Sequence, residues 1–201
     1  MSWIQIVPFD KAEGQLKKLY QRVTGPNNNV DNIMGVHSLR PHSMEGHMAL
    51  YKNVLHHRNN ALPKSYLETA GVYVSYLNKC DYCVEHHFAG LSRLINDQEQ
   101  ANKIFQALRS EAFDDTFSQK EKSGLVYAKK LTIDHSSLIE KDIENLRDSG
   151  FDDGEILELN QVVSYFNYAN RTVLGLGVST KGDILGLSPN DDEDPKNWGH
   201  S

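Results

Sequence analysis

Four residues in one short stretch of this sequence have the types and spacing needed for thiol chemistry. Cys80 and Cys83 are the only cysteines among the 201 residues. On a helix, positions i and i+3 share a face, so the two thiols can approach closely enough for a disulfide after modest adjustment. His87 follows Cys83 by four residues, where an imidazole can take the thiol proton or stabilise a thiolate. Glu68 precedes the pair by one helix length, and its carboxylate can hold His87 or relay a proton.

The helices expected around these residues place both thiols at a helix start. One helix is predicted from about Cys80 to Ile95, and an earlier, antiparallel helix beginning at Pro63 carries Glu68. Unpaired N–H groups and the positive end of the helix dipole lower a thiol pKa from roughly 8.5 toward neutrality. A thiolate there can attack a peroxide O–O bond and become a sulfenic acid, after which the partner cysteine closes a disulfide.

Helical periodicity continues along nearly the whole chain, so the predicted fold class is all-α. Apolar residues recur at three- and four-residue spacing in helices that begin near residues 10, 41, 63, 80, 97, 118, 137 and 152. The only strand-like piece, Trp3 to Val7, is too short to define a sheet. Asp10–Glu13 and Ser118–Glu121 have the pattern of a capping box, and Ser137–Glu140 and Asp152–Glu155 are predicted to open helices.

Composition and charge exclude several classes of function. The formal net charge is −6 with no basic block, which argues against nucleic acid and anionic membranes as partners. No apolar run reaches eighteen residues, and Met1 to Asp10 does not have the form of a secretory signal, so a cytoplasmic protein is expected. In a reducing compartment, two cysteines three residues apart indicate catalysis, redox sensing or metal binding rather than a structural disulfide.

The spacing of these residues resembles that of a known family. Glu68, eleven residues, Cys80-Asp81-Tyr82-Cys83, three residues and His87 together resemble the AhpD-like alkylhydroperoxidases of the carboxymuconolactone decarboxylase superfamily, especially its peroxidase-related branch. The segments 165–171 (YFNYANR) and 174–178 (LGLGV) also look like that branch, and the likeness covers roughly residues 33–178.

This resemblance implies an AhpD-like helical bundle that forms homo-oligomers and works without cofactor or metal. The implied enzyme is an oxidoreductase with a peroxide as acceptor: it reduces a small hydroperoxide, and a dithiol donor such as a lipoyl protein re-reduces its disulfide. By the same likeness Cys83 attacks the peroxide, Cys80 resolves the intermediate, and Glu68 and His87 relay protons. Tyr82 stands where the best-studied members carry histidine. Residues 1–187 are expected to form one domain, with an N-terminal arm at 1–32 and a core at about 33–178, followed by an acidic tail at 188–201.

Other functions remain open at this point. A thiol-disulfide reductase or redox sensor with weak peroxidase activity is favoured by Tyr82, because tyrosine is a poor base near neutral pH. A lactone decarboxylase is disfavoured, since those relatives lack the paired cysteines, and a non-catalytic oligomeric scaffold leaves the cysteines without a purpose. A zinc site needs four ligands; there is no third cysteine, but the nine histidines leave it open. A c-type haem is excluded because Val84 follows Cys83.

Several polar residues are interpreted as structural. His86 is expected at a surface or interface, and Asn167 and Asn170 are expected either to cap another helix or to line the active site. The tail from Ser188 on, with its acidic run at 191–194, is interpreted as solvated or partner-contacting. The remaining cluster of histidines is expected to be solvated or interfacial: His37, His42, His47, His56 and His57.

Overall fold

The computed structural model describes residues 2–189, 194 and 197–200, and it confirms the all-α fold class. In this part of the chain no strand is formed, and a single isolated bridge joins Pro189 to His200. The α-helices are α1 (Gly14–Val23), α2 (Asn32–Gly35), α3 (Pro41–Leu55), α4 (Lys64–Leu77), α5 (Asp81–Ile95), α6 (Gln98–Ser110), α7 (Gln119–Ile133), α8 (Glu140–Asp148) and α9 (Asp153–Leu176). Short 3₁₀ turns lie at Phe9–Lys11, Pro26–Asn28 and His135–Ser137.

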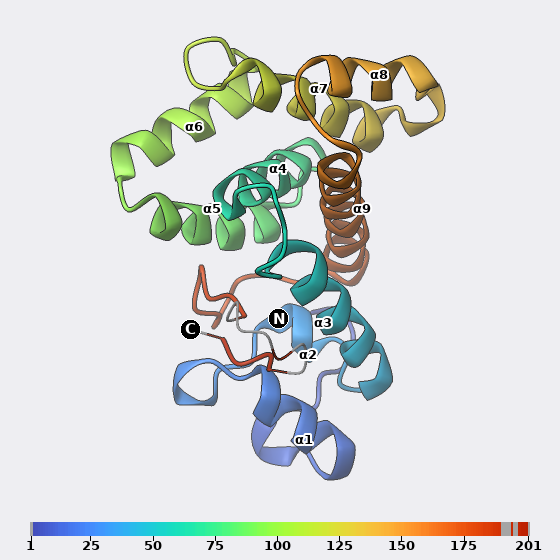
Figure 1. Cartoon of the computed structure of the whole chain (residues 1–201). Helices are drawn as coiled ribbons and strands as arrows, with labels where there is room; N and C mark the ends of the chain where they lie inside the picture. Colours follow the sequence, from blue (N-terminus) through green and yellow to red (C-terminus); the bar gives the residue numbers. More distant parts are fainter. Residues whose placement is uncertain (1, 190–193, 195–196, 201) are drawn as a thin grey trace.

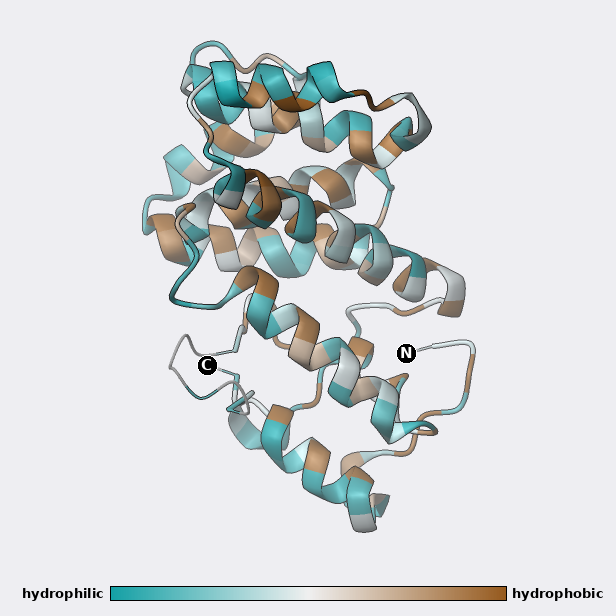
Figure 2. Cartoon of the chain, turned by 45° about the vertical axis from the view of Figure 1, so that its right-hand side comes forward, coloured by the Kyte–Doolittle hydropathy of each residue, from teal (hydrophilic) through white to brown (hydrophobic). Residues whose placement is uncertain are grey.

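Helix α4 is the centre of the bundle, and it packs against α5, α7 and α9 (Figure 1). Helices α6, α7 and α8 lie on one side of this centre, whereas α1, α2, α3 and both chain ends lie on the other. Ten consecutive residues of α4, from Tyr66 to Ser75, are buried. Most other helices carry brown and teal faces in Figure 2, as expected for helices that bury one stripe.

Two of the four helix starts predicted from these sequence patterns carry a capping box. Ser118 and Glu121 at the start of α7 satisfy each other's backbone N–H groups, and Asp152 and Glu155 do the same for α9. The box at Asp10–Glu13 is wrong: a 3₁₀ turn covers Phe9–Lys11 and α1 begins only at Gly14, without a side-chain cap.

The helix predicted to open at Ser137–Glu140 does begin there, but Ser137 does not cap it. Ser137 ends a 3₁₀ turn, and α8 begins at Glu140. The carboxylate that accepts the N–H of Ile139 belongs to Asp142, at a distance of 2.8 Å. Asp142 is held in place by Lys130 of α7, a tertiary contact that local sequence rules do not contain.

A close contact between α4 and α9 fixes the frame of the bundle. Gly71 faces the ring of Phe166, and a Cβ atom at position 71 would lie 2.2 Å from that ring. Glycine therefore lets the two helices approach at this point. The predicted stripe of Met44 and Met48 on α3 is confirmed as core, since both side chains are fully buried.

The chain after α9 returns to the bundle instead of leaving it. Arg93 on α5 donates to the carbonyl of Gly186, and Gly186 lies against the backbone of Ala89. Near the C-terminus, Trp198 and His200 are buried, in contrast to the expected solvated tail. Residues 191–193 of the acidic run lie outside the described part of the chain, whereas Asp194 is described and exposed.

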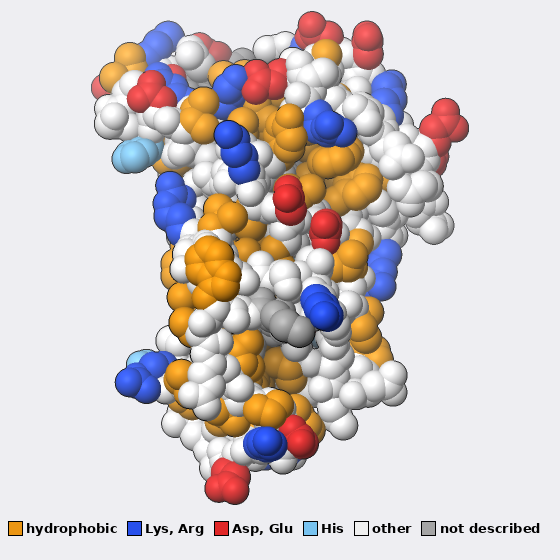
Figure 3. All heavy atoms as spheres, turned by 180° about the vertical axis from the view of Figure 1, so that it is seen from behind, with side chains coloured by type: hydrophobic (Ala, Val, Ile, Leu, Met, Phe, Trp, Pro, Cys, Tyr) orange, Lys and Arg blue, Asp and Glu red, His pale blue; other side chains and the backbone are white. Residues whose placement is uncertain are grey.

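The surface carries charges of both signs scattered among apolar side chains. On the face seen in Figure 3, lysines and arginines stand singly between hydrophobic and acidic groups. Among the described residues, no helix is both long and apolar enough to cross a bilayer.

Candidate active site

The two cysteines lie where α4 turns into α5. Cys80 is the N-cap residue of α5 and Cys83 is the third residue of the helix; both are buried and neither forms a disulfide. The turn is tight because Lys79 adopts a left-handed conformation, with φ of 57°. This turn makes α4 and α5 antiparallel neighbours, which brings Glu68 back toward α5.

The environment of the two thiols makes them unequal in acidity. The Cys83 side chain and its backbone N–H both hydrogen-bond to the sulfur of Cys80 and lower the pKa of Cys80, against the opposing effect of burial. The same thiol contact, followed by burial, raises the pKa of Cys83, while a hydrogen bond from Asn170 lowers it. A thiolate in the resting pair is therefore more stable on Cys80. This agrees with its N-cap position, where unpaired N–H groups meet.

The predicted contact between Glu68 and His87 is present. Nδ1 of His87 lies 2.8 Å from Oε2 of Glu68, and the Glu68 side chain is almost completely buried. Phe166 packs edge-on against the imidazole, with ring centroids 4.5 Å apart. Oε1 of Glu68 also lies 3.9 Å from Nε2 of His56. Burial holds the pKa of His56 well below its usual value, so this second histidine is neutral.

Tyr82 belongs to a second polar cluster that sequence reasoning missed. Its hydroxyl donates to Oδ2 of Asp183 at 2.7 Å and accepts the N–H of Ile33 at 3.2 Å. Nε2 of His86 lies 3.2 Å from the same oxygen of Asp183. Burial raises the pKa of Tyr82 well above 10, so the phenol stays protonated. Asp183 comes from the segment after α9, about a hundred positions from Tyr82, and no local sequence pattern predicts their contact.

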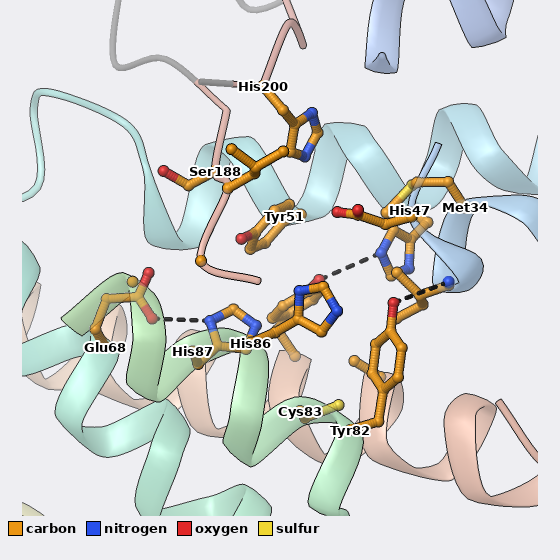
Figure 4. A pocket seen from close by; sticks show the side chains of 17 residues that line it. Met34, His47, Tyr51, Glu68, Tyr82, Cys83, His86, His87, Ser188 and His200 are labelled. Carbon is orange, nitrogen blue, oxygen red and sulfur yellow. Dashed lines mark hydrogen bonds and ion pairs between the residues drawn. The ribbon is translucent and has the colours of Figure 1, made fainter. Parts of the chain in front are cut away.

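Glu68, His87, Tyr82 and His86 line one cavity with a volume of about 40 Å³. Figure 4 shows Glu68 and His87 on one side, Tyr82 on the other, and Cys83 between them at the base. The described residues that line it include Cys83 but not Cys80. Tyr51 and Tyr165 stack at 5.2 Å, and His47 and His200 complete the opposite wall.

The burial of several histidines differs from the sequence interpretation. His37, His47, His56 and His86 are all buried, although each was expected to be solvated or interfacial; of the others in that cluster, His42 is exposed and His57 is half-buried. Burial lowers the pKa of His47 to about 3 and that of His200 to about 4. No group of three potential metal ligands is found within the described ranges.

Asn167 and Asn170 act mainly on the end of α4. Both side-chain carbonyls accept hydrogen bonds from the amide of Asn78, the C-cap residue of α4. Asn170 also donates to Ser75, and its hydrogen bond to Cys83 lowers the thiol pKa. Asn170 therefore supports a helix end, as one alternative predicted, and it hydrogen-bonds to Cys83 without lining the cavity.

Comparison with known proteins addresses the family. Residues 41–127 match the model of the carboxymuconolactone decarboxylase family. The resemblance seen in the sequence is thereby confirmed, and the matched segment holds Glu68, Cys80, Cys83 and His87. Members of this family are enzymes. No curated protein matches the sequence at a significant level.

Solved structures with the same fold include two peroxidase-related proteins and a debrominase. An "alkylhydroperoxidase AhpD core" protein from Ralstonia eutropha JMP134 is 20% identical, with a TM-score of 0.77 over 92% of this chain and 96% of its own. A peroxidase-related protein from Silicibacter sp. TM1040 is 22% identical, with a TM-score of 0.71 over 89% and 91%. The debrominase Bmp8, in complex with 2,3,4-tribromopyrrole, is 14% identical, with a TM-score of 0.69 over 88% and 90%. At these identities the likeness establishes the shared AhpD-like fold.

Proposed function

We propose that this protein reduces small hydroperoxides through a dithiol–disulfide cycle of Cys80 and Cys83. The observation that supports this best is that Cys83, Glu68 and His87 line one cavity. A nucleophile, a base and a group that orients the base are the parts needed to activate a thiol. Attack of the Cys83 thiolate on the peroxide gives a sulfenic acid and an alcohol, and Cys80 then displaces water to form the disulfide.

The cavity suits a small polar substrate. Its volume of about 40 Å³ is several times the roughly 10–15 Å³ that a cavity needs to hold one water molecule. Nδ1 of His47 and Nδ1 of His200 are buried and have no hydrogen-bond partner among the described residues. Buried polar atoms require partners, and the hydroxyl and oxygen atoms of a hydroperoxide supply a donor and acceptors. Because both imidazoles are neutral, they can bind such a molecule without attracting an anion.

The expected partner is a small dithiol, such as the lipoyl group of a carrier protein. Both sulfur atoms are buried, so a bulky protein disulfide cannot meet them without rearrangement of the fold. The alternative is a thiol-disulfide reductase or redox sensor with weak peroxidase activity. It would form the same disulfide but would consume little peroxide. A sensor is oxidised once per molecule, whereas a peroxidase consumes many equivalents of peroxide when dihydrolipoamide is supplied.

The test is a thiol count before and after one equivalent of tert-butyl hydroperoxide. We expect two free thiols to fall to none, with mass spectrometry placing the disulfide on the peptide that contains Cys80 and Cys83. Turnover is then measured with dihydrolipoamide and excess peroxide. Two thiols that persist under excess oxidant would disprove the cycle, and oxidation without turnover would favour the sensor.

A second candidate is reductive dehalogenation of a small aromatic ring. The aromatic lining of the cavity, with Tyr51, Tyr82 and Tyr165, is the observation that favours it, together with the fold shared with a debrominase. The thiolate would take the halogen, the ring carbon would take a proton, and the second thiol would release halide as the disulfide forms. Release of bromide from a bromopyrrole, with loss of both thiols, would support this candidate over the first.

A further inference from the structure

His86 occupies a position from which it can act on the same cavity as Cys83. It follows Tyr82 by four residues on α5 and stacks on the phenol ring, with centroids 4.5 Å apart. Its side chain is 9% exposed and lines the cavity. Figure 4 shows the imidazole between His87 and Tyr82, above Cys83.

Asp183 fixes the orientation of this imidazole. Its carboxylate accepts hydrogen bonds from Nε2 of His86, from the hydroxyl of Tyr82 and, with both oxygens, from the N–H of Asn32. The Asp183 side chain is 2% exposed. Because Nε2 faces Asp183, Nδ1 is the ring nitrogen left to act on a molecule in the cavity.

The proposed reaction needs a proton donor for the leaving oxygen as well as a base for the thiol. The Glu68–His87 pair is assigned to the thiol. When a thiolate attacks a hydroperoxide, the O–O bond breaks and the leaving oxygen becomes a strongly basic alkoxide. Tyr82 is a poor donor to it, because its proton is directed at Asp183 and burial raises its pKa well above 10. His86 presents an imidazole within the same cavity wall.

We propose that His86, oriented by Asp183, donates the proton to the leaving oxygen, while His87 and Glu68 receive the proton of the thiol. The proposal rests on the hydroperoxide reduction proposed above. Atoms balance as follows: the sulfur of Cys83 bonds to the terminal OH, the O–O electron pair leaves with the alkoxy oxygen, and the proton on Nδ1 converts it to the alcohol. Tyr82 thus helps to orient His86 and does not itself donate the proton.

Asp31 is a second carboxyl group near His86. It is buried in the cavity wall, and burial, partly offset by His86, raises its carboxyl pKa to about 6. The titratable groups that face His86 are Asp31 and Asp183, with Tyr82, His87 and His200 also near it. A carboxyl group with a pKa raised this far can exchange a proton with the imidazole between turnovers.

The experiment compares two oxidants that differ in their need for a proton. tert-Butyl hydroperoxide releases an alkoxide, whereas peracetic acid releases a carboxylate, which is stable without protonation. Single-turnover loss of thiols is measured for the reduced wild-type protein and for His86→Gln. We expect the substitution to slow the alkyl hydroperoxide about 100-fold or more, and peracetic acid less than about threefold, as for loss of a general acid.

Two further variants keep the result interpretable. Asp183→Asn retains the size of the side chain and should slow thiol loss less than His86→Gln does, again mainly with the alkyl hydroperoxide. If His86→Gln fails to fold, this variant tests the proposal in its place. His135→Gln, an exposed histidine in the 3₁₀ turn His135–Ser137, is the matched control and should leave both rates unchanged.

Each remaining outcome contradicts the assignment. Equal slowing with both oxidants would mean that His86 only supports the fold, and unchanged rates would mean that it has no role. A wild-type protein oxidised by peracetic acid but not by the alkyl hydroperoxide would instead overturn the proposed function, and this inference with it.

Discussion

At the scale of single residues, acidity and access select different thiols for the attack. The hydrogen bonds at the helix start favour the thiolate on Cys80, but only Cys83 lines the cavity in the described structure. A proton can move between the two sulfurs along one hydrogen bond, whereas Cys80 is fully buried and does not line the cavity. Access therefore decides, and Cys83 is expected to attack.

This assignment predicts opposite results for the two serine variants. Cys83→Ser should abolish consumption of hydroperoxide, because no nucleophile then faces the cavity. Cys80→Ser should still form a sulfenic acid at Cys83, trapped by dimedone and located by mass spectrometry, but should form no disulfide. If Cys80 is the labelled residue and Cys83→Ser permits labelling, the helix-start effect outweighs access and the roles are reversed.

Sequence reasoning found the residues joined by local spacing and missed those brought in by the fold. Cys80, Cys83 and His87 lie within eight positions of one helix start, so their shared face follows from helix geometry. From the C-terminal segment, His200 lines the cavity, and Asp183 contacts two residues that line it, Tyr82 and His86. His86 was expected at a surface or interface, but it is buried. Its burial depends on a contact with Asp183, and helical periodicity cannot predict that contact.

At the scale of helices, the packing of α4 on α9 supports the catalytic histidine. Gly71 allows the ring of Phe166 to approach α4, and Phe166 in turn packs against His87. The helix pair therefore fixes both the bundle and the position of the proposed base.

Gly71→Ala should disturb both properties. The added methyl group must displace Phe166, and overpacking of this kind costs about 1–3 kcal/mol of unfolding free energy. Urea unfolding should show the loss, and thiol oxidation should slow because His87 loses its packing surface. Gly46→Ala is the matched control: the site is exposed on α3 with open space around it, and alanine there should stabilise the helix by roughly 0.5–1 kcal/mol. Unchanged stability of Gly71→Ala would contradict the close contact.

Helix positions were largely predictable, and helix starts only where the cap is local. Ser118 and Asp152 each find their partner three residues later on the same helix, which a sequence pattern captures. The start of α8 instead uses Asp142, held by Lys130 of a neighbouring helix. Asp10 and Glu13 show the opposite case. They match the capping-box pattern, but Asp10 lies in a 3₁₀ turn and no side chain caps α1.

At the scale of the whole molecule, the surface suits association with further copies. Val126 and Ile133 lie two turns apart on one face of α7, and each is more than half exposed. Hydrophobic side chains also appear at the surface in Figure 3. Burial of such side chains between subunits would stabilise an oligomer.

Light scattering at micromolar concentration should therefore give a mass that is a multiple of that of one chain. We expect the double substitution Val126→Lys and Ile133→Lys to lower this mass, since unpaired charges would enter the contact. The exposed pair Lys141→Ala and Asp148→Ala on α8 is the control. A wild-type monomer would contradict the expected assembly, and an unchanged mass in the lysine variant would place the contact elsewhere.

Buried neutral histidines have a second consequence for the whole fold. His37, His47, His56 and His200 all have pKa values lowered by burial, to about 3 for His47 and about 4 for His200. In the unfolded chain each titrates near 6.5. Between these values the unfolded chain binds more protons than the folded one, so stability falls as the pH drops below about 6.5.

Asp31 acts in the opposite direction but is outnumbered. Its carboxyl pKa is raised to about 6 by burial, so between about 4 and 6 the folded chain binds more protons at this site than the unfolded chain. That contribution favours the folded state as the pH falls. One carboxyl group with a shift of about two pKa units cannot offset several histidines, of which His47 alone is shifted by more than three.

The protein is therefore expected to unfold more readily in mild acid. From about pH 7 to about pH 4.5, His47 alone should remove roughly 2–3 kcal/mol of unfolding free energy, at about 1.4 kcal/mol per pKa unit. Urea unfolding at a series of pH values measures the slope, and His47→Gln, which cannot gain a proton, should flatten it. His42→Gln, exposed on the same helix, should leave the slope as in the wild type. Equal stability at both pH values, or a full slope in His47→Gln, would mean that protons reach these imidazoles without unfolding the bundle.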